Sequence, residues 1–366
     1  MAQEQKAKEY NRKKIFLEIA ETIWLIIFLI WLMYGGWAVA IRNFLASLSS
    51  STWVLNGLYI IVFLLLIKVV ILPLSYYSSY RIEHRYGLSR ESFSAWMVDE
   101  LKELALSIGF GLLIGETVYA LMARFPYLWW LIASLILNVA LIILTKLAPV
   151  VLMPIFFRFK RLEDKELEAR LIRLTDQAHT RISGVFEMSL GQKTKAANAA
   201  LAGIGSTRRI ILSDTLLEGY NHDEIETILA HELGHHVYNH MWKGILIQSL
   251  LITLLFFLIA HSLGKGVLWF HLKGIDDIAG LPYLTLITTL FSLIFLPLVN
   301  LYLRSLEYKA DHYGVSITGK RDSFISALEK LARQNLCDQE PNPVVEFLFY
   351  SHPSISKRIG RLLVNG

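Results

Sequence analysis

The chain has 366 residues, of which 54% are hydrophobic, and a mean hydropathy of +0.45. This composition is too apolar for an ordinary soluble domain and is typical of an integral membrane protein. The formal net charge of +5 is therefore attributed to basic loops beside a membrane and not to nucleic-acid binding. Cys337 is the only cysteine, which excludes an internal disulfide and requires any metal site to be built from histidines and carboxylates.

Six stretches are long and apolar enough to cross a bilayer as helices, each near the ~20 residues that a span requires. We expect these spans at residues 15–37, 53–77, 103–123, 127–150, 242–262 and 282–303. They divide the chain into a four-span region (1–157), a catalytic segment (158–241), two further spans (242–303) and a C-terminal catalytic segment (304–366).

The first span follows a basic leader and ends near "AVA" at Ala38–Ala40, which resembles a signal-peptidase site. A cleaved leader has a short, uninterrupted apolar core, whereas this apolar run is long and contains Glu18 and Glu21. We therefore expect an uncleaved anchor.

Basic residues alternate between the loops. The leader is rich in Lys and Arg from Lys6 to Lys14, the next loop has only Arg42, and the segment after the fourth span is again basic. Because cytoplasmic loops carry the excess of Lys and Arg, both termini and both catalytic segments are expected on the cytoplasmic side.

The catalytic segment 158–241 shows three local patterns. Residues 163–181 have the apolar spacing of an amphipathic helix. "NAALAGIG" and "RRIILSDTLL" are typical of a β-hairpin with glycines near its turn. Asn221, followed three residues later by Glu224, predicts a capping box at the start of a helix.

The first hairpin strand has the small side chains that would let a second backbone approach closely, at Ala199, Ala200, Leu201 and Ala202. We predict that this strand is an exposed edge to which a peptide substrate adds as a further strand. Proline at Ala200 is then expected to remove an N–H group from that edge. The alternative is an ordinary hairpin strand with small residues for packing.

The helix that follows carries "HELGH", in which His231 and His235 are four residues apart and share one face. Two neutral imidazoles in H-E-x-x-H bind Zn²⁺, and the intervening Glu232 takes a proton from the attacking water. A metzincin would have a third histidine shortly afterwards, but Tyr238 and Met241 occupy the later positions of that motif. His236 and His240 are not expected to be ligands, His240 because it lies too far along the helix.

A third ligand must therefore come from elsewhere, because catalytic zinc has three protein ligands and one open position. "RSLEYKAD" places Glu307 and Asp311 on one helical face directly after the last span. Glu307 is the expected ligand, and Asp311 is expected to accept the N–H of a ligating histidine. The alternative is a solvated helix with an Arg304–Glu307 ion pair. Near the C-terminus, "YSHPSISKRIGRL" reads from its residues alone as a short helix start with a basic face.

Together these motifs resemble the Ste24 family, the integral-membrane zinc CAAX prenyl proteases of the M48 class. The resemblance extends from about Phe63 onward and includes, in the family's order, "YRIEHRYGLS", "NAALAGIGSTRRIILSDTLL", "HELGHH", "LRSLEYKAD" and "SHPSISKR". It implies zinc bound by His231, His235 and Glu307, with Asp311 supporting a ligand. It further implies that Glu232 is catalytic, that His352 and Arg358 steady the substrate and its oxyanion, and that Asn198 opens the substrate-binding edge strand.

The resemblance also implies a mostly α fold, in which six or seven spans form a helical barrel around an internal chamber. A cytoplasmic, zincin-like α+β part would carry the site. Polar residues within the expected spans would line the chamber, at Lys68, Glu116, Asn138 and Lys146. The family has seven spans, whereas this sequence shows six. The large insertion that eukaryotic members carry before the zinc helix is absent here. The compact form here resembles bacterial or archaeal relatives, whose location would be the inner or plasma membrane.

The expected function is that of a membrane-embedded zinc endopeptidase with one Zn²⁺ per chain. Its substrate would be a peptide or protein, prenylated near its C-terminus or otherwise membrane-associated. Three alternatives remain open: an HtpX-like quality-control protease, a site-2-type intramembrane protease, and a six-span transporter. The site-2 type places H-E-x-x-H inside a span, whereas polar residues such as Asp223 and Glu226 precede the motif here.

Overall fold

The computed structural model describes residues 2–364, and six helices in this part of the chain are long and apolar enough to cross a membrane, as predicted. The long helices are α1 (Ala2–Tyr34), α3 (Thr52–Ser75), α5 (Phe93–Arg124), α6 (Trp129–Leu147), α11 (His240–Trp269) and α12 (Leu281–Thr318). Short helical segments extend three of them: η1 (Tyr76–Arg81) and α4 (Ile82–Tyr86) after α3, η2 (Ala148–Leu152) and α7 (Met153–Phe156) after α6, and η4 (Ile278–Gly280) before α12.

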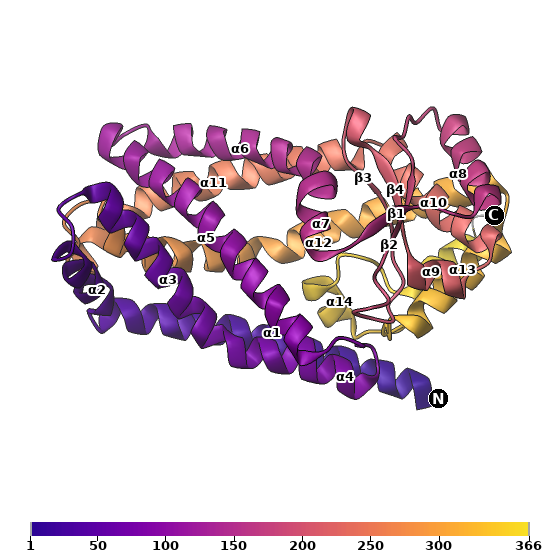
Figure 1. The fold of residues 1–366 in the computed structure, drawn as a ribbon, viewed down its shortest axis with the longest axis horizontal. Coiled ribbons are helices and arrows are strands. Elements are labelled where there is room, and N and C mark those ends of the chain that lie inside the picture. Colours follow the sequence, from indigo (N-terminus) through magenta and orange to yellow (C-terminus); the bar gives the residue numbers. More distant parts are fainter. Residues whose placement is uncertain (1, 365–366) are drawn as a thin grey trace.

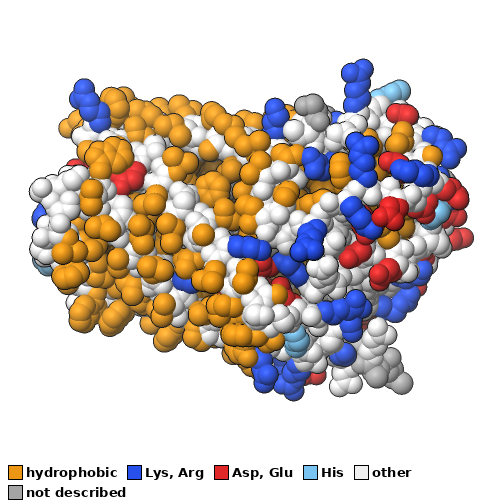
Figure 2. Space-filling view, in the orientation of Figure 1, with side chains coloured by type: hydrophobic (Ala, Val, Ile, Leu, Met, Phe, Trp, Pro, Cys, Tyr) orange, Lys and Arg blue, Asp and Glu red, His pale blue; other side chains and the backbone are white. Residues whose placement is uncertain are grey.

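The long helices form an elongated cage, and a sheet with its covering helices closes one end of it (Figure 1). Both ends of the described chain lie near the sheet, as an even number of spans requires. The surface over the cage is mainly hydrophobic, whereas charged side chains gather around the sheet (Figure 2). Such a division of the surface is typical of a protein with a membrane-embedded region and a second region that lies in water.

A short helix that the sequence analysis did not predict, α2 (Trp37–Ala46), lies at the cage end far from the sheet (Figure 1). It contains the Ala38–Ala40 stretch, and its Ala38 is buried. Arg42 of α2 forms a buried ion pair with Asp277 in the segment between α11 and α12. Ten residues are too few to span a bilayer, so hydropathy alone does not reveal this helix.

A cavity of about 640 Å³ lies inside the cage, between α1, α5, α6, α11 and α12. Its described lining is mostly apolar with a few threonines, and none of the four polar residues expected in a wet chamber belongs to it. At least two of them have partners in neighbouring helices instead: Lys68 forms an ion pair with Glu100 of α5, and Asn138 donates to Thr253 of α11 across 3.3 Å. Polar side chains in a span thus stabilise helix pairs here.

The sheet has four strands, β1 (Phe159–Arg161), β2 (Val185–Met188), β3 (Ala199–Ala202) and β4 (Arg209–Ser213), in the order β1-β2-β4-β3. β3 and β4 form the predicted antiparallel hairpin, and β3 is an edge strand. Its turn contains η3 (Gly205–Thr207) and requires glycine at Gly203, where φ is +94° and a Cβ would lie 2.6 Å from the Thr207 carbonyl oxygen.

Helices pack around this sheet and complete the aqueous domain. They are α8 (Lys165–Gln177), α9 (Asp214–Gly219), α10 (His222–Val237), α13 (Arg321–Gln334), α14 (Pro343–Phe349) and α15 (Ile355–Val364). The predicted amphipathic face of α8 is buried through Leu167, Leu171 and Leu174, in one core with apolar residues of β4 and α10. This core fixes α10 against the sheet, with β3 beside it.

Candidate metal centre

The H-E-x-x-H motif lies on α10, which begins with the predicted capping box. The side chain of Asn221 accepts the N–H of Glu224 at 2.9 Å, and the Glu224 carboxylate accepts the N–H of Asn221 at the same distance. Both contacts satisfy N–H groups that a helix start leaves without partners. Glu224 is buried and also accepts hydrogen bonds from Ser326 and Lys330 of α13. The cap therefore fixes the start of the motif helix against a second helix.

Two glycines bring α10 into backbone contact with α12. A Cβ on Gly234 would lie 3.0 Å from the Cα of Ala310, and a Cβ on Gly314 would lie 3.1 Å from the backbone nitrogen of His231. Helices can approach this closely only where side chains are absent from the contact. The glycine within the motif is thus what lets the histidine-bearing face of α10 meet Glu307 and Asp311.

The three predicted ligands converge where the two helices meet. Nε2 of His231 and Nε2 of His235 are 3.1 Å apart. They lie 3.4 and 3.3 Å from the two carboxylate oxygens of Glu307. Tetrahedral zinc with bonds of about 2.0–2.1 Å separates its ligand atoms by about 3.3 Å. The donor set and its spacing therefore fit one zinc ion, and one ligand position would remain open.

The remaining nitrogen of His231 has the partner that the sequence predicts. Nδ1 of His231 lies 2.8 Å from Oδ1 of Asp311. Burial alone would lower the pKa of His231, but the carboxylates of Asp311 and Glu307 raise it to about 9. A carboxylate at Nδ1 fixes the ring so that Nε2 faces the centre.

Arg358 of α15 is buried and acts on Asp311. Its Nε lies 2.9 Å from Oδ2 of Asp311 and its Nη2 lies 2.5 Å from Oδ1, which is a bidentate ion pair. Such a fork holds a carboxylate in one orientation. That Arg358 steadies the substrate stays a prediction, and the geometry adds a chain of support from Arg358 through Asp311 to His231.

A cavity of about 390 Å³ opens onto this centre. The residues that line it include Asn198, Ala199, His231, Glu232, Glu307, His352 and Arg358. Nδ1 of His352 lies 2.9 Å from a carboxylate oxygen of Glu307, although 66% of the His352 side chain is exposed. The predicted catalytic residues and the start of the predicted substrate strand therefore share one cavity, while Ala200, Leu201 and Ala202 are not among its described lining residues.

His240 lies outside the group of candidate ligands, but it contacts one of them, His235, which its sequence position does not indicate. It begins α11 after a break in the helix at Asn239, whose φ is +56°, and its Nδ1 lies 3.0 Å from Nδ1 of His235. The two rings meet because the chain turns between the helices, which helical spacing along one helix cannot predict. The buried His240 thus orients His235 as Asp311 orients His231.

Replacing His240 by Ala is expected to weaken zinc binding by about 10-fold, because partners of ligating histidines contribute to metal affinity at that level. Competition with a chromogenic chelator on the purified chain measures this. His236→Ala, on the motif helix α10 but outside the ligand set, is the matched control and should leave the affinity unchanged. Equal affinity in the two variants would show that His240 does not support the ligand.

The register of β3 corrects the expectation for Ala200. The N–H of Ser213 donates to the carbonyl of Asn198 at 2.9 Å. Hydrogen-bonded pairs alternate in an antiparallel ladder, and Ala200 pairs with Ile211. The N–H of Ala200 therefore points into the sheet, whereas Ala199 and Leu201 present theirs to the free edge. Proline at Ala200 would break the hairpin and not only the edge.

The alternative ion pair between Arg304 and Glu307 is also absent among the described residues. Arg304 is buried and donates instead to the main-chain carbonyls of Glu346, in the last turn of α14, and of Tyr350, the residue after α14. The Glu307 carboxylate faces His231 and His235. The α10 motif lies outside every candidate span, unlike the motif of a site-2-type protease.

Comparison with known proteins agrees with this architecture. Residues 161–364 match the family model described as Peptidase family M48, and residues 2–158 match one described as CAAX prenyl protease N-terminal, five membrane helices. The chain has four span-length helices and the short α2 in that region.

Relatives are found in bacteria and eukaryotes. The chain is 31% identical to the "Uncharacterized metalloprotease YhfN" of Bacillus subtilis, an alignment that covers 96% of this chain and 84% of the relative. It is 30% identical to CAAX prenyl protease 1 of Saccharomyces cerevisiae, over 80% of this chain and 69% of that protein. The crystal structure of S. mikatae Ste24p superposes with a TM-score of 0.88 at 26% identity, over 99% of this chain and 88% of that one. The chain belongs to peptidase family M48 and is an integral-membrane metalloendopeptidase.

Proposed function

We propose that the metal is one zinc ion held by His231, His235 and Glu307, and that Glu232 is the general base for attack of water on a peptide bond. The observation that carries this proposal is the convergence of three ligand atoms within 4.8 Å of one another, beside a cavity that Glu232 also lines. Zinc bound there supplies Lewis-acid activation of water and of the scissile carbonyl.

The protein side chains around the ion have separate tasks in this proposal. Glu232 accepts the proton that the attacking water loses and delivers it to the leaving nitrogen. His352 projects into the cavity, where its ring can donate to the oxyanion that forms at the scissile carbonyl. Asp311 and Arg358 keep the His231 ring in place throughout.

The substrate docks along β3 as an added antiparallel or parallel strand. β3 is at the sheet edge, and Asn198 and Ala199 line the cavity beside the candidate ligands. Main-chain hydrogen bonds to a strand edge give affinity with little dependence on side chains. Ala199 and Leu201 offer their main-chain groups to the peptide, and the exposed Asn198 can bond to it at the start of the strand.

Replacing Ala199 by Pro is expected to raise KM about 10-fold with normal zinc content, because it removes one outward N–H. The first residue of an edge strand tolerates proline. Steady-state cleavage of a fluorogenic peptide measures the change. Ala200→Pro is the matched control, and it should lower the melting temperature because it removes an inward N–H. An unchanged KM in a folded, zinc-loaded Ala199→Pro variant would exclude docking on β3.

The substrates are polypeptides held at the membrane, cut near a lipidated C-terminus. Relatives in yeast and Arabidopsis thaliana are named CAAX prenyl proteases, and the cavity beside the centre has apolar walls that include Phe324, Leu328 and Phe349. Two peptides that differ only in a farnesyl group on one cysteine test this. Preference for the farnesylated peptide supports the proposal, whereas equal cleavage of both favours a quality-control protease of the HtpX type.

Both termini and the metal centre lie on the cytoplasmic side in this proposal, since the basic loops lie at the end of the cage where the sheet lies. A reporter fused after Gly366 should be active only in its cytoplasmic form. Activity of its extracytoplasmic counterpart would reverse the orientation.

A further inference from the structure

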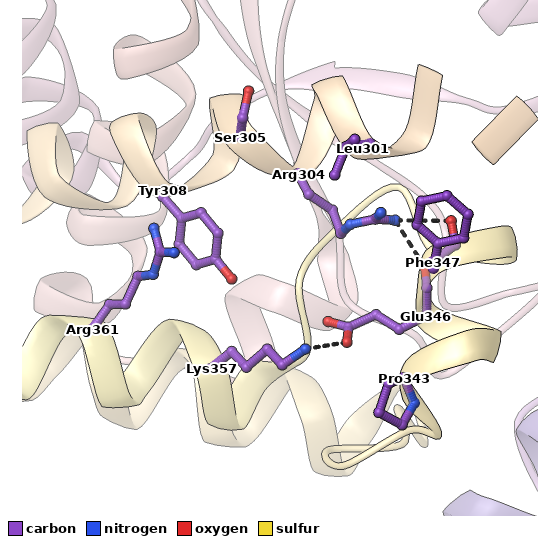
Figure 3. A pocket seen from close by; sticks show the side chains of 9 residues that line it. All are labelled: Leu301, Arg304, Ser305, Tyr308, Pro343, Glu346, Phe347, Lys357 and Arg361. Atoms are coloured by element: carbon purple, nitrogen blue, oxygen red, sulfur yellow. Dashed lines mark hydrogen bonds and ion pairs between the residues drawn. The ribbon is translucent and has the colours of Figure 1, made fainter. Parts of the chain in front are cut away.

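Arg304 lies on α12 one turn before Glu307, yet its guanidinium bonds to main-chain carbonyls at the end of α14 and not to that carboxylate. It is buried, and its Nη1 donates to the main-chain carbonyl of Glu346 at 2.8 Å and to that of Tyr350. The carbonyl of Phe347 lies 3.5 Å from the same nitrogen. Figure 3 shows the guanidinium directed at the end of α14, away from Lys357 and Arg361 of α15.

These carbonyls belong to the last turn of α14 and to the residue after it. The last carbonyls of a helix have no partner within the helix, and a cation near them is favourable. Asn300, one turn earlier on α12, donates to the next carbonyl in this group, that of Leu348, at 2.9 Å. α12 therefore holds the end of α14 through two buried side chains.

Tyr350 is two residues before His352, so the same contacts fix the start of the segment that carries this histidine. The end of the segment is fixed from α14, because Oε1 of the buried Glu346 accepts the N–H of Ser354 at 3.1 Å. Lys357 forms an ion pair with the other oxygen of Glu346 (Figure 3). Residues 350–354 are thus anchored at both ends, and the exposed His352 ring lies between the anchors.

We propose that Arg304 is a positioning residue for His352, and this proposal rests on the catalytic role proposed above for that histidine. α12 carries both Glu307 and, one turn earlier, the anchor of the His352 segment, so one helix sets the distance between a metal ligand and an oxyanion donor. Donors that act on a transition state must be held within a fraction of an ångström, and a misplacement of about 1 Å can cost about 100-fold in rate.

Replacing Arg304 by Met keeps the aliphatic stem and removes the donors. We expect kcat for a fluorogenic peptide to fall about 10- to 100-fold, with zinc content and KM close to those of the parent. Arg361→Met is the matched control: Arg361 lines a surface pocket together with Arg304 (Figure 3), but its guanidinium lies 3.5 Å from the centre of the Tyr308 ring, away from the end of α14. This control should retain the parent kcat.

A double-mutant cycle separates positioning from general destabilisation. In a His352→Ala background, Arg304→Met should change kcat by less than about 2-fold, because the group that it positions is already gone. A full, additive loss in that background would overturn the proposal. Loss of zinc in Arg304→Met would overturn it as well, since Arg304 would then act through Glu307.

Arg304→Lys is the replacement test variant if Arg304→Met does not fold. It keeps the charge and a donor at a shorter reach, so its kcat should fall less than that of Arg304→Met, and that smaller loss should also vanish in the His352→Ala background. If the proposed catalytic role of His352 is wrong, a different result is expected: His352→Ala would then retain full activity. In that case any loss in Arg304 variants arises elsewhere, and the positioning role is excluded.

Discussion

Replacing Glu232 by Gln is expected to lower kcat by about 10³-fold or more while zinc stays bound. Glutamine keeps the size of the side chain but cannot accept the proton of the attacking water, and general bases contribute about 10²–10⁴-fold. Glu232 lines the cavity without being one of the three candidate ligands, so metal content should be that of the parent.

The measurement pairs peptide cleavage with zinc analysis on the same purified sample. Glu218→Gln, on the exposed surface of α9, is the matched control and should keep the parent rate. A Glu232→Gln variant that holds zinc and cleaves at the parent rate would remove Glu232 from the mechanism.

Replacing Glu307 by Ala is expected to deplete zinc on dialysis and to abolish cleavage. Two histidines alone bind zinc weakly, because a catalytic site has three protein ligands. The carboxylate is buried between His231 and His235, so no water-exposed acid can replace it readily. Emission spectrometry after dialysis against a weak chelator measures the loss.

Glu329→Ala is the control for this experiment, because Glu329 is half exposed on α13 and pairs with Arg333. Asp311→Asn should show a milder defect, on the order of 10–100-fold in zinc affinity. Zinc retained by Glu307→Ala and lost by the Glu329 variant would mean that a different carboxylate binds the metal.

Much of the fold could be predicted because its signals are local. Long apolar runs predict the spans, Asn221 and Glu224 predict the start of α10, and the glycines after β3 predict the hairpin turn. The convergence of His231, His235 and Glu307 could be predicted from two helical spacings and the resemblance. The close packing of α10 on α12 through Gly234 and Gly314 could not, since a glycine in a helix has many possible reasons.

The missed features depend on contacts between segments that no periodicity describes. His240 reaches His235 because the helix is interrupted at Asn239, between α10 and α11. Helical spacing offered Arg304 only Glu307 as an alternative partner, and it could not predict the contact of Arg304 with the carbonyls of α14. Which N–H groups of β3 point outward depends on the register of β3 with β4. The sequence of one strand shows that its N–H groups alternate in direction, but not which of them face the neighbouring strand.

The central claim is that this chain hydrolyses peptide bonds with one zinc ion bound between α10 and α12. The most direct measurement is cleavage of a fluorogenic peptide by the purified full chain in lipid nanodiscs, before and after zinc is stripped and then titrated back. Cleavage should stop in the stripped protein and return fully at one equivalent of zinc. Cleavage that persists without zinc, or none at any zinc level, would contradict the claim.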